Sequence, residues 1–307
     1  MPHILAAALL ITASLLAPQL HAASPIQATL ALPHDKVLPG VPFDLVVTYT
    51  NVSDKPVTIG GALATLVVTF ANGDTVVMDK PDVNDQWNIG DSSKPVQLAP
   101  GESVQQAAGW EDGSIPNWFR YGSFSGPGTY GVALDLRITD KYEQPVGTVR
   151  TPAVTLTRIE PVGIDAALWK RIQEISNGAW SDDSFVATKP GSALAAEIIQ
   201  LHPSSGYYPY VVAFRAFDVH EKGKKHLPAL LEAAERFPGS PAYPYLLSAA
   251  ADCARYAGSV ARDEGNVAEA TKYFTLAESK YREALATRSV AIRSSSERGL
   301  FDVTRGR

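Results

Sequence analysis

One sequence motif occurs twice in the chain. Pro203-Ser204-Ser205-Gly206-Tyr207-Tyr208-Pro209-Tyr210-Val211-Val212 returns 35 residues later as Pro238-Gly239-Ser240-Pro241-Ala242-Tyr243-Pro244-Tyr245-Leu246-Leu247. Self-similarity with a period between about 20 and 50 residues is typical of stacked repeats. In each copy the first proline ends one helix, the serine can cap the next, and the later proline falls in its first turn, where a missing amide costs nothing. The stretch therefore predicts helical hairpins in the second half of the chain.

The surrounding sequence supports a wholly helical second half. Apolar spacing and turn signals predict helices at residues 166–175, 192–202, 207–220, 227–236, 242–262 and 267–287. Residues 192–290 resemble the tetratricopeptide repeat, whose small and aromatic positions are matched by Gly258, Ala270, Phe274 and Ala277, with Gly265-Asn266 at the turn. That resemblance implies paired antiparallel helices with a concave surface for peptides.

The first half has the pattern of strands. Residues 25–158 carry alternating or β-branched runs separated by Gly, Pro, Asn and Asp. Asn72-Gly73 predicts a hairpin turn between strands at 64–70 and 75–78. About seven to nine such strands predict a two-sheet sandwich.

Several turn and strand-edge motifs follow one another in the order 39–42, 98–103, Trp110 and 126–130. In this order they resemble bacterial immunoglobulin-like modules, including the domain of the bacillar intracellular proteinase inhibitor family. The resemblance covers about residues 26–158 and implies an immunoglobulin-like β-sandwich. The resemblance is used to predict the fold only, and not proteinase inhibition.

The N-terminal segment predicts export. Residues 4–16 form an apolar run of the length of a signal-peptide core, too short to span a bilayer, and Leu20-His21-Ala22 offers a cleavage site. We therefore expect a signal peptide at 1–22, periplasmic or secreted localisation, and no integral membrane segment after cleavage. Residues 24–159 hold 9 Lys+Arg against 14 Asp+Glu, and the rest of the chain is balanced, which argues against nucleic acid as a partner.

No motif of a known catalytic chemistry stands out. The chain contains no His-Glu-x-x-His, no paired Cys-x-x-Cys, no Gly-x-Ser-x-Gly and no phosphate-binding Gly-rich loop. The one cysteine, Cys253, lies in an alanine-rich helical segment and is expected to be a core residue. The aspartates at 79, 82, 85 and 91 lack the spacing of a calcium loop. We expect no catalytic residues, no metal and no cofactor.

Two groups of aromatic residues are candidates for binding. The first is the repeat tyrosines Tyr207, Tyr208, Tyr210, Tyr243 and Tyr245, which either line a peptide-binding groove or pack between hairpins or against the sandwich. The second is the segment from Trp110 to Phe124, with Trp118, Phe119 and Tyr121, which either contacts a sugar or partner or packs onto its own domain.

These observations predict three regions. A signal peptide at 1–22 precedes an immunoglobulin-like β-sandwich at 23–159 and an α-helical tetratricopeptide-like domain at 160–307. The predicted function is non-catalytic binding of a protein or peptide, or scaffolding, in the bacterial envelope. The alternatives are an inhibitor or accessory module that acts through sandwich loops, and a carbohydrate-binding protein that uses the 110–124 segment. The sequence does not specify the partner or the oligomeric state.

Overall fold

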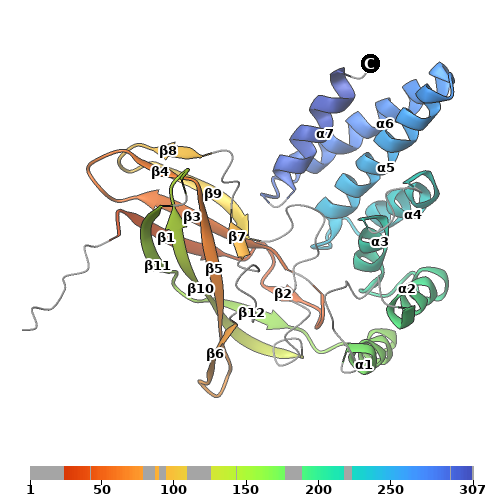
Figure 1. Cartoon of the computed structure of the whole chain (residues 1–307). Coiled ribbons are helices and arrows are strands. Elements are labelled where there is room, and N and C mark those ends of the chain that lie inside the picture. The colour runs from red at the N-terminus through yellow and green to blue at the C-terminus, as the bar shows by residue number, and fades with distance from the viewer. Residues whose placement is uncertain are drawn as a thin grey trace, which may run out of the picture.

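The computed structural model describes residues 24–41, 43–78, 87–89, 95–108, 126–142, 144–176, 189–217, 223–290 and 292–305 (Figure 1). The described strands lie between residues 26 and 158, and the described helices between 164 and 305. The prediction of a strand-rich first half and a helical second half is therefore confirmed. We call residues 24–159 the strand half and residues 160–305 the helix half. The predicted signal peptide lies outside the described residues.

The strand half is built mainly from one extended sheet. Its strands are β1 (Ile26–Ala31), β2 (Lys36–Val37), β3 (Leu45–Asn51), β4 (Val57–Ile59), β5 (Gly61–Thr69), β6 (Thr75–Met78), β7 (Trp87–Ile89), β8 (Val96–Leu98), β9 (Ser103–Ala108), β10 (Gly128–Thr139), β11 (Pro145–Arg150) and β12 (Val154–Arg158). In β1 buried and exposed residues alternate, as expected for a strand with one face against the core. In β10 the alternate residues Val132, Leu134, Leu136 and Ile138 are all fully buried.

The predicted immunoglobulin-like sandwich is wrong. Among the described strands, ten form one continuous sheet in the order β1-β3-β9-β7-β5-β10-β12-β2, with β6 added to β5 and β11 to β10. The sheet is mixed, because β12 pairs with β2 in parallel and the other pairs are antiparallel; β4 and β8 form a separate small sheet. The motifs behind the resemblance describe local turns, and local turns do not determine which strands become neighbours.

The predicted hairpin between β5 and β6 is present, but its turn is not the two-residue Asn-Gly turn, in which both central residues take positive φ. Gly73 takes a φ of 89°, whereas Asn72 is not among the positive-φ residues. The Asn72 side chain instead accepts a hydrogen bond from the Asp74 N–H at 3.0 Å. Phe70 and Asp74 therefore close a three-residue loop in which only the glycine needs the left-handed conformation.

The helix half is a row of helices in which each packs on the next along the chain (Figure 1). In the described chain they are α1 (Ile164–Ser176), α2 (Lys189–Leu201), α3 (Tyr208–Phe217), α4 (Gly223–Arg236), α5 (Tyr243–Asp263), α6 (Val267–Ala286) and α7 (Arg293–Arg305). The alternate helices α3 and α5, and α5 and α7, also contact each other. The Asn266 side chain caps α6 by accepting from the Glu269 N–H, and Pro244 lies in the first turn of α5.

The predicted tetratricopeptide repeat is also wrong. Tyr208 and Tyr243 begin helices 35 residues apart, but Gly223 and Val267 begin the partner helices 44 residues apart, so the two units are unequal. The small residue Gly258, on which the resemblance partly rested, allows one close crossing between α5 and α6. A Cβ atom added to Gly258 of α5 would lie 2.8 Å from the ring of Phe274 in α6.

A single hydrophobic core runs through both halves. Buried residues of the sheet, such as Leu45 and Leu134, belong to the same packed cluster as Leu168, Leu246 and Ala277 of the helices. Within the described part of the chain, no helix combines the length and apolar character that crossing a membrane requires.

Candidate functional site

Four of the five repeat tyrosines are buried inside the molecule. Tyr207 and Tyr208 are each 2% exposed, Tyr245 is 5% exposed and Tyr210 is 6% exposed, whereas Tyr243 is half-buried. A peptide groove lined by the tyrosines would require exposed rings, and these four rings are not exposed. Tyr208 packs beside Phe237 between α3 and α4, with ring centroids 5.8 Å apart.

Two of these tyrosines reach across to the strand half. Their targets lie in the connection between β2 and β3, in the residues Leu38–Val41, Phe43 and Asp44, which we call the junction loop. The Tyr207 hydroxyl donates to the Pro39 carbonyl oxygen at 3.1 Å. The Tyr245 hydroxyl donates to the Asp44 carboxylate. The repeat thus places one anchoring phenol at the start of α3 and another at the start of α5.

The serines of the repeat position these phenols. Ser205 Oγ accepts a hydrogen bond from the Tyr207 N–H at 3.0 Å, and Ser240 Oγ accepts from the Ala242 N–H at 3.1 Å. The serines thus accept from backbone amides just before the two helices, but the predicted cap is not formed at α5, whose N-cap residue is Ala242 and has no side-chain cap hydrogen bond. In the first copy Ser205 Oγ also donates to Asp165 Oδ1 at 2.6 Å, which ties the start of α3 to the first turn of α1.

A buried arginine holds the junction loop from the strand side. Arg158, the last residue of β12, is 3% exposed, and its Nη1 donates to the carbonyl oxygens of Leu38 at 2.9 Å and Val41 at 2.5 Å. Its guanidinium also lies over the Phe43 ring, 5.2 Å from the centroid. Burial lowers the pKa of Arg158 to about 10, so the guanidinium stays protonated at neutral pH.

Asp44 is the acidic group of the junction. Its side chain is half-buried, and burial raises its pKa to about 6, although the hydrogen bond from Tyr245 works in the opposite direction. The phenols of Tyr210 and Tyr245 face this carboxyl from α3 and α5, and burial keeps the pKa of each phenol above its usual value. The two phenols are therefore neutral hydrogen-bonding groups over the physiological range.

Glycines allow the two halves to approach this closely. Gly40 has a φ of 73°, and a Cβ atom there would lie 2.5 Å from Cζ3 of Trp169 in α1. A Cβ on Gly206 would lie 2.6 Å from Cδ1 of Leu38. A larger residue at Gly40 would clash with the Trp169 ring and strain the backbone, and one at Gly206 would require the Leu38 side chain to move.

The junction includes residues that the sequence did not single out as a site. Asp44 and Arg158 looked like ordinary members of strands, and Gly40 like a turn residue. Tyr207 and Pro39 are 168 positions apart, and Tyr245 and Asp44 are 201 positions apart. No local pattern indicates contacts over such separations.

The other predicted candidates divide into described and undescribed residues. Cys253 is buried, and burial raises the pKa of its thiol to about 12, as expected for a core residue. Among the described residues, no group of three or more His, Cys, Asp or Glu side chains could hold a metal ion. Trp110, Trp118, Phe119, Tyr121 and Phe124 lie outside the described residues, as do the aspartates at 79, 82, 85 and 91.

Comparisons with known proteins assign no family. No family model and no curated protein matches the chain. Among solved structures, the sporulation control protein Spo0M from Bacillus subtilis matches with a TM-score of 0.30 at 13% identity, over 50% of this chain and 55% of that chain. AvmM, which catalyses macrocyclization in alchivemycin A biosynthesis, matches with a TM-score of 0.25 at 16% identity, over 46% of this chain and 92% of that one. At these scores the similarities carry no argument about fold or function.

Proposed function

We propose that this chain is an exported, non-catalytic protein of the bacterial envelope that binds a protein or peptide partner and acts as a scaffold. The support comes from an exposed surface of α5, on the same side of the helix as the Tyr245 side chain that contacts the junction loop. Tyr256 follows Tyr245 by 11 residues, which is close to three helical turns, so both side chains leave α5 on the same side. Tyr245 is anchored on the junction loop, and Tyr256 is exposed.

This surface, which we call the α5 patch, consists of Asp252, Arg255, Tyr256 and Val260. Tyr256 is 42% exposed and Val260 is 39% exposed. The charged residues beside them are held in place, because the Tyr281 hydroxyl of α6 donates to Asp252 at 2.5 Å and Arg255 Nε donates to the same hydroxyl oxygen at 3.3 Å. An exposed aromatic ring beside a fixed arginine has the composition that protein interfaces favour.

The junction supports a scaffolding role for this patch. Because Tyr207, Tyr245 and Arg158 tie the junction loop to both halves, the α5 patch keeps a set orientation relative to the sheet. A pre-organised surface loses less conformational freedom on binding than a mobile one. We infer that a partner meets the patch in one fixed geometry.

The test is affinity capture from an envelope extract with residues 23–307 as bait. A Tyr256→Ala/Val260→Ala variant removes the apolar part of the patch. A Val52→Ala/Tyr142→Ala variant removes the same two residue types from exposed positions in the strand half. We expect a partner that the wild type and the strand-half variant capture equally and the patch variant captures at least roughly tenfold less, about 1.4 kcal/mol of binding free energy. Equal capture by all three proteins would remove the patch from the proposal.

A further inference from the structure

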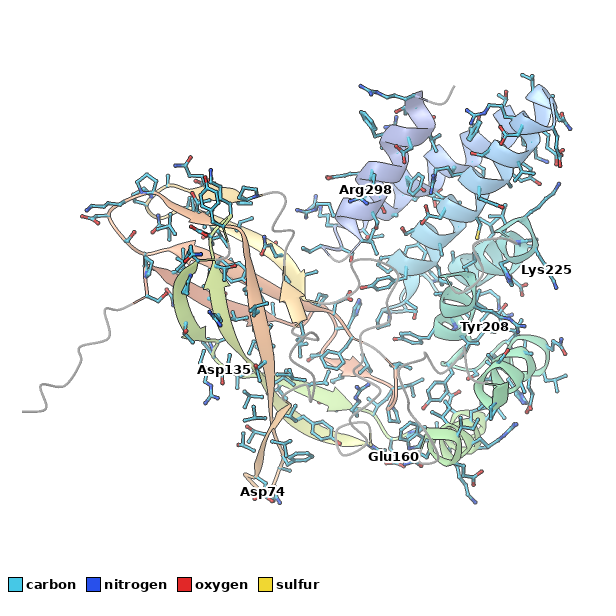
Figure 2. All side chains as sticks on the ribbon, in the orientation of Figure 1. Asp74, Asp135, Glu160, Tyr208, Lys225 and Arg298 are labelled. Carbon is cyan, nitrogen blue, oxygen red and sulfur yellow. The ribbon has the colours of Figure 1, made fainter. Side chains whose placement is uncertain are left out.

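The outer edge of β6 is an exposed strand with a defined hydrogen-bonding pattern. Val76 is 39% exposed and Val77 is 48% exposed, and every residue from Ala71 to Val77 is exposed. The β5–β6 hairpin, with Asp74 at its tip, reaches the lower end of the strand half in Figure 2. In the described part of the chain, β6 pairs with β5 alone.

The register of the hairpin shows which backbone groups of β6 point outward. The Phe70 N–H donates to the Asp74 carbonyl at 2.8 Å, which makes Phe70 and Asp74 a hydrogen-bonded pair. Antiparallel pairing alternates, so Val68 with Val76 is the next hydrogen-bonded pair, and Thr69 with Thr75 and Val67 with Val77 are the non-hydrogen-bonded pairs. The hydroxyls of Thr69 and Thr75 lie 3.3 Å apart, as expected for the closer, non-hydrogen-bonded pair. The N–H and C=O groups of Thr75 and Val77 therefore point away from β5.

Apart from its short length of four residues, this edge lacks the usual features that block strand pairing. Edge strands are commonly protected by charged residues, prolines or bulges. The four residues Thr75, Val76, Val77 and Met78 include no charge and no proline, and β5 and β6 pair without a register shift. Four outward backbone groups on an exposed, β-branched strand fit the backbone of another extended strand.

We propose that the β6 edge pairs with β6 of a second copy of this chain, antiparallel and about a two-fold axis at Val76. In this register Thr75 of one copy meets Val77 of the other, and each pair exchanges two hydrogen bonds, so all four outward groups on both copies are satisfied. The two Val76 side chains meet at the axis. Asp74 lies opposite Met78 of the other copy, so no like charges face each other. This interface is independent of the α5 patch and of the proposed scaffold function.

The size of the edge determines the strength of this dimer. Stable dimers bury at least about 1,000 Å² in total, and a contact of four residues on each side buries less. The dimer is therefore weak and depends on concentration.

The test is analytical ultracentrifugation of the full mature chain over a wide concentration range. In Val77→Pro the outward N–H is lost, while the bonds between β6 and β5 remain. Val77→Thr keeps the N–H and serves as the matched control. By symmetry the proline removes two hydrogen bonds, so we expect its dissociation constant to rise roughly tenfold or more, with Val77→Thr close to wild type.

A second variant guards against misfolding of the proline variant. Val76→Lys places two positive charges opposite each other at the axis and leaves the backbone unchanged, so we expect it to be monomeric at low salt and to regain self-association at high salt. A wild type that stays monomeric at every concentration would overturn the proposal, as would dimers of unchanged strength in both Val77→Pro and Val76→Lys.

Hydrogen exchange locates the contact. We expect the amides of Thr75 and Val77 to be exposed in dilute wild-type protein and to become protected as the concentration rises. Protection already present in dilute protein would mean that another part of the same chain occupies the edge, and this would also overturn the proposal. Protection that appears only after a foreign extended peptide is added would assign the edge to a different partner and overturn it as well.

Discussion

Asp44 is the carboxyl group of the junction loop, and its protonation bears directly on the contact with Tyr245. Its carboxyl accepts the hydroxyl of Tyr245, and the phenol of Tyr210 lies close enough to feel its charge. Arg158, the buried cation of the junction, directs its hydrogen bonds to Leu38 and Val41. Burial therefore raises the pKa of Asp44 to about 6, compared with 3.8 for an ordinary aspartate.

This raised pKa predicts a pH dependence of stability. Between about pH 4 and pH 6 the folded chain holds a proton on Asp44 that the unfolded chain has released, so the free energy of unfolding falls as the pH rises. The loss from this one group is about 2–3 kcal/mol. Asp44→Asn cannot ionise and is expected to lack this loss.

The measurement is urea unfolding from pH 4 to pH 7.5 for wild type, Asp44→Asn and the exposed control Asp54→Asn. Other groups titrate in the same way in all three proteins, so the difference between two proteins isolates the substituted group. Parallel stability curves for wild type and Asp44→Asn would show that Asp44 titrates normally.

Gly40 is required by its conformation and by its contact with Trp169. Gly101 has a similar φ of 78°, but a methyl group added there would meet no atom within 4 Å, so Gly101→Ala measures the conformational cost alone. We expect Gly101→Ala to destabilise by about 1 kcal/mol and Gly40→Ala by about 2–4 kcal/mol. Equal losses in urea unfolding would mean that Trp169 moves aside freely.

At the scale of secondary-structure elements, α5 and α6 share the most extensive contact of the described helix pairs. Gly258 lets the Phe274 ring of α6 approach the backbone of α5, and Arg262 lies over that ring at 5.7 Å. Gly258→Ala should therefore destabilise by about 1–2 kcal/mol, because the overpacking outweighs the better helix propensity of alanine. The control is Gly239→Ala, where a methyl group meets no atom within 4 Å. A Gly258→Ala variant as stable as wild type in thermal unfolding would show that the crossing adjusts.

Helices and strands could be predicted where the residues that determine them lie within or beside the element itself. The predicted helix at 242–262 matches α5 within a residue at each end, because Pro244, the apolar period and the Gly265 turn all lie in or beside that segment. The order of strands could not be predicted, because each strand pattern is compatible with many neighbours. The unequal repeats were also missed, because the serine and proline motif sets where a helix begins and not how long the unit is.

Part of the site was predictable for the same reason. The hydrogen bonds of the repeat serines to backbone amides, and the alternative in which the tyrosines pack inside the molecule, follow from the repeat itself. The partners of those tyrosines do not, because Pro39 and Asp44 reach them only after the whole strand half has folded.

At the scale of the whole molecule, the strand and helix halves share one core and one hydrogen-bonded junction. The repeat that first suggested a binding groove serves to join the halves, and the surfaces that we propose for partners are the α5 patch and the β6 edge. The junction fixes α5, which carries the α5 patch, relative to the large sheet, which carries the β6 edge.

The central claim is that the repeat tyrosines couple the two halves, and a double-mutant cycle between Asp44 and Tyr245 tests it most directly. The free energy of unfolding is measured for wild type, Asp44→Ala, Tyr245→Phe and the double variant at pH 7. We predict a coupling energy of about 1–2 kcal/mol across the junction. Effects that add within about 0.3–0.5 kcal/mol would contradict this claim.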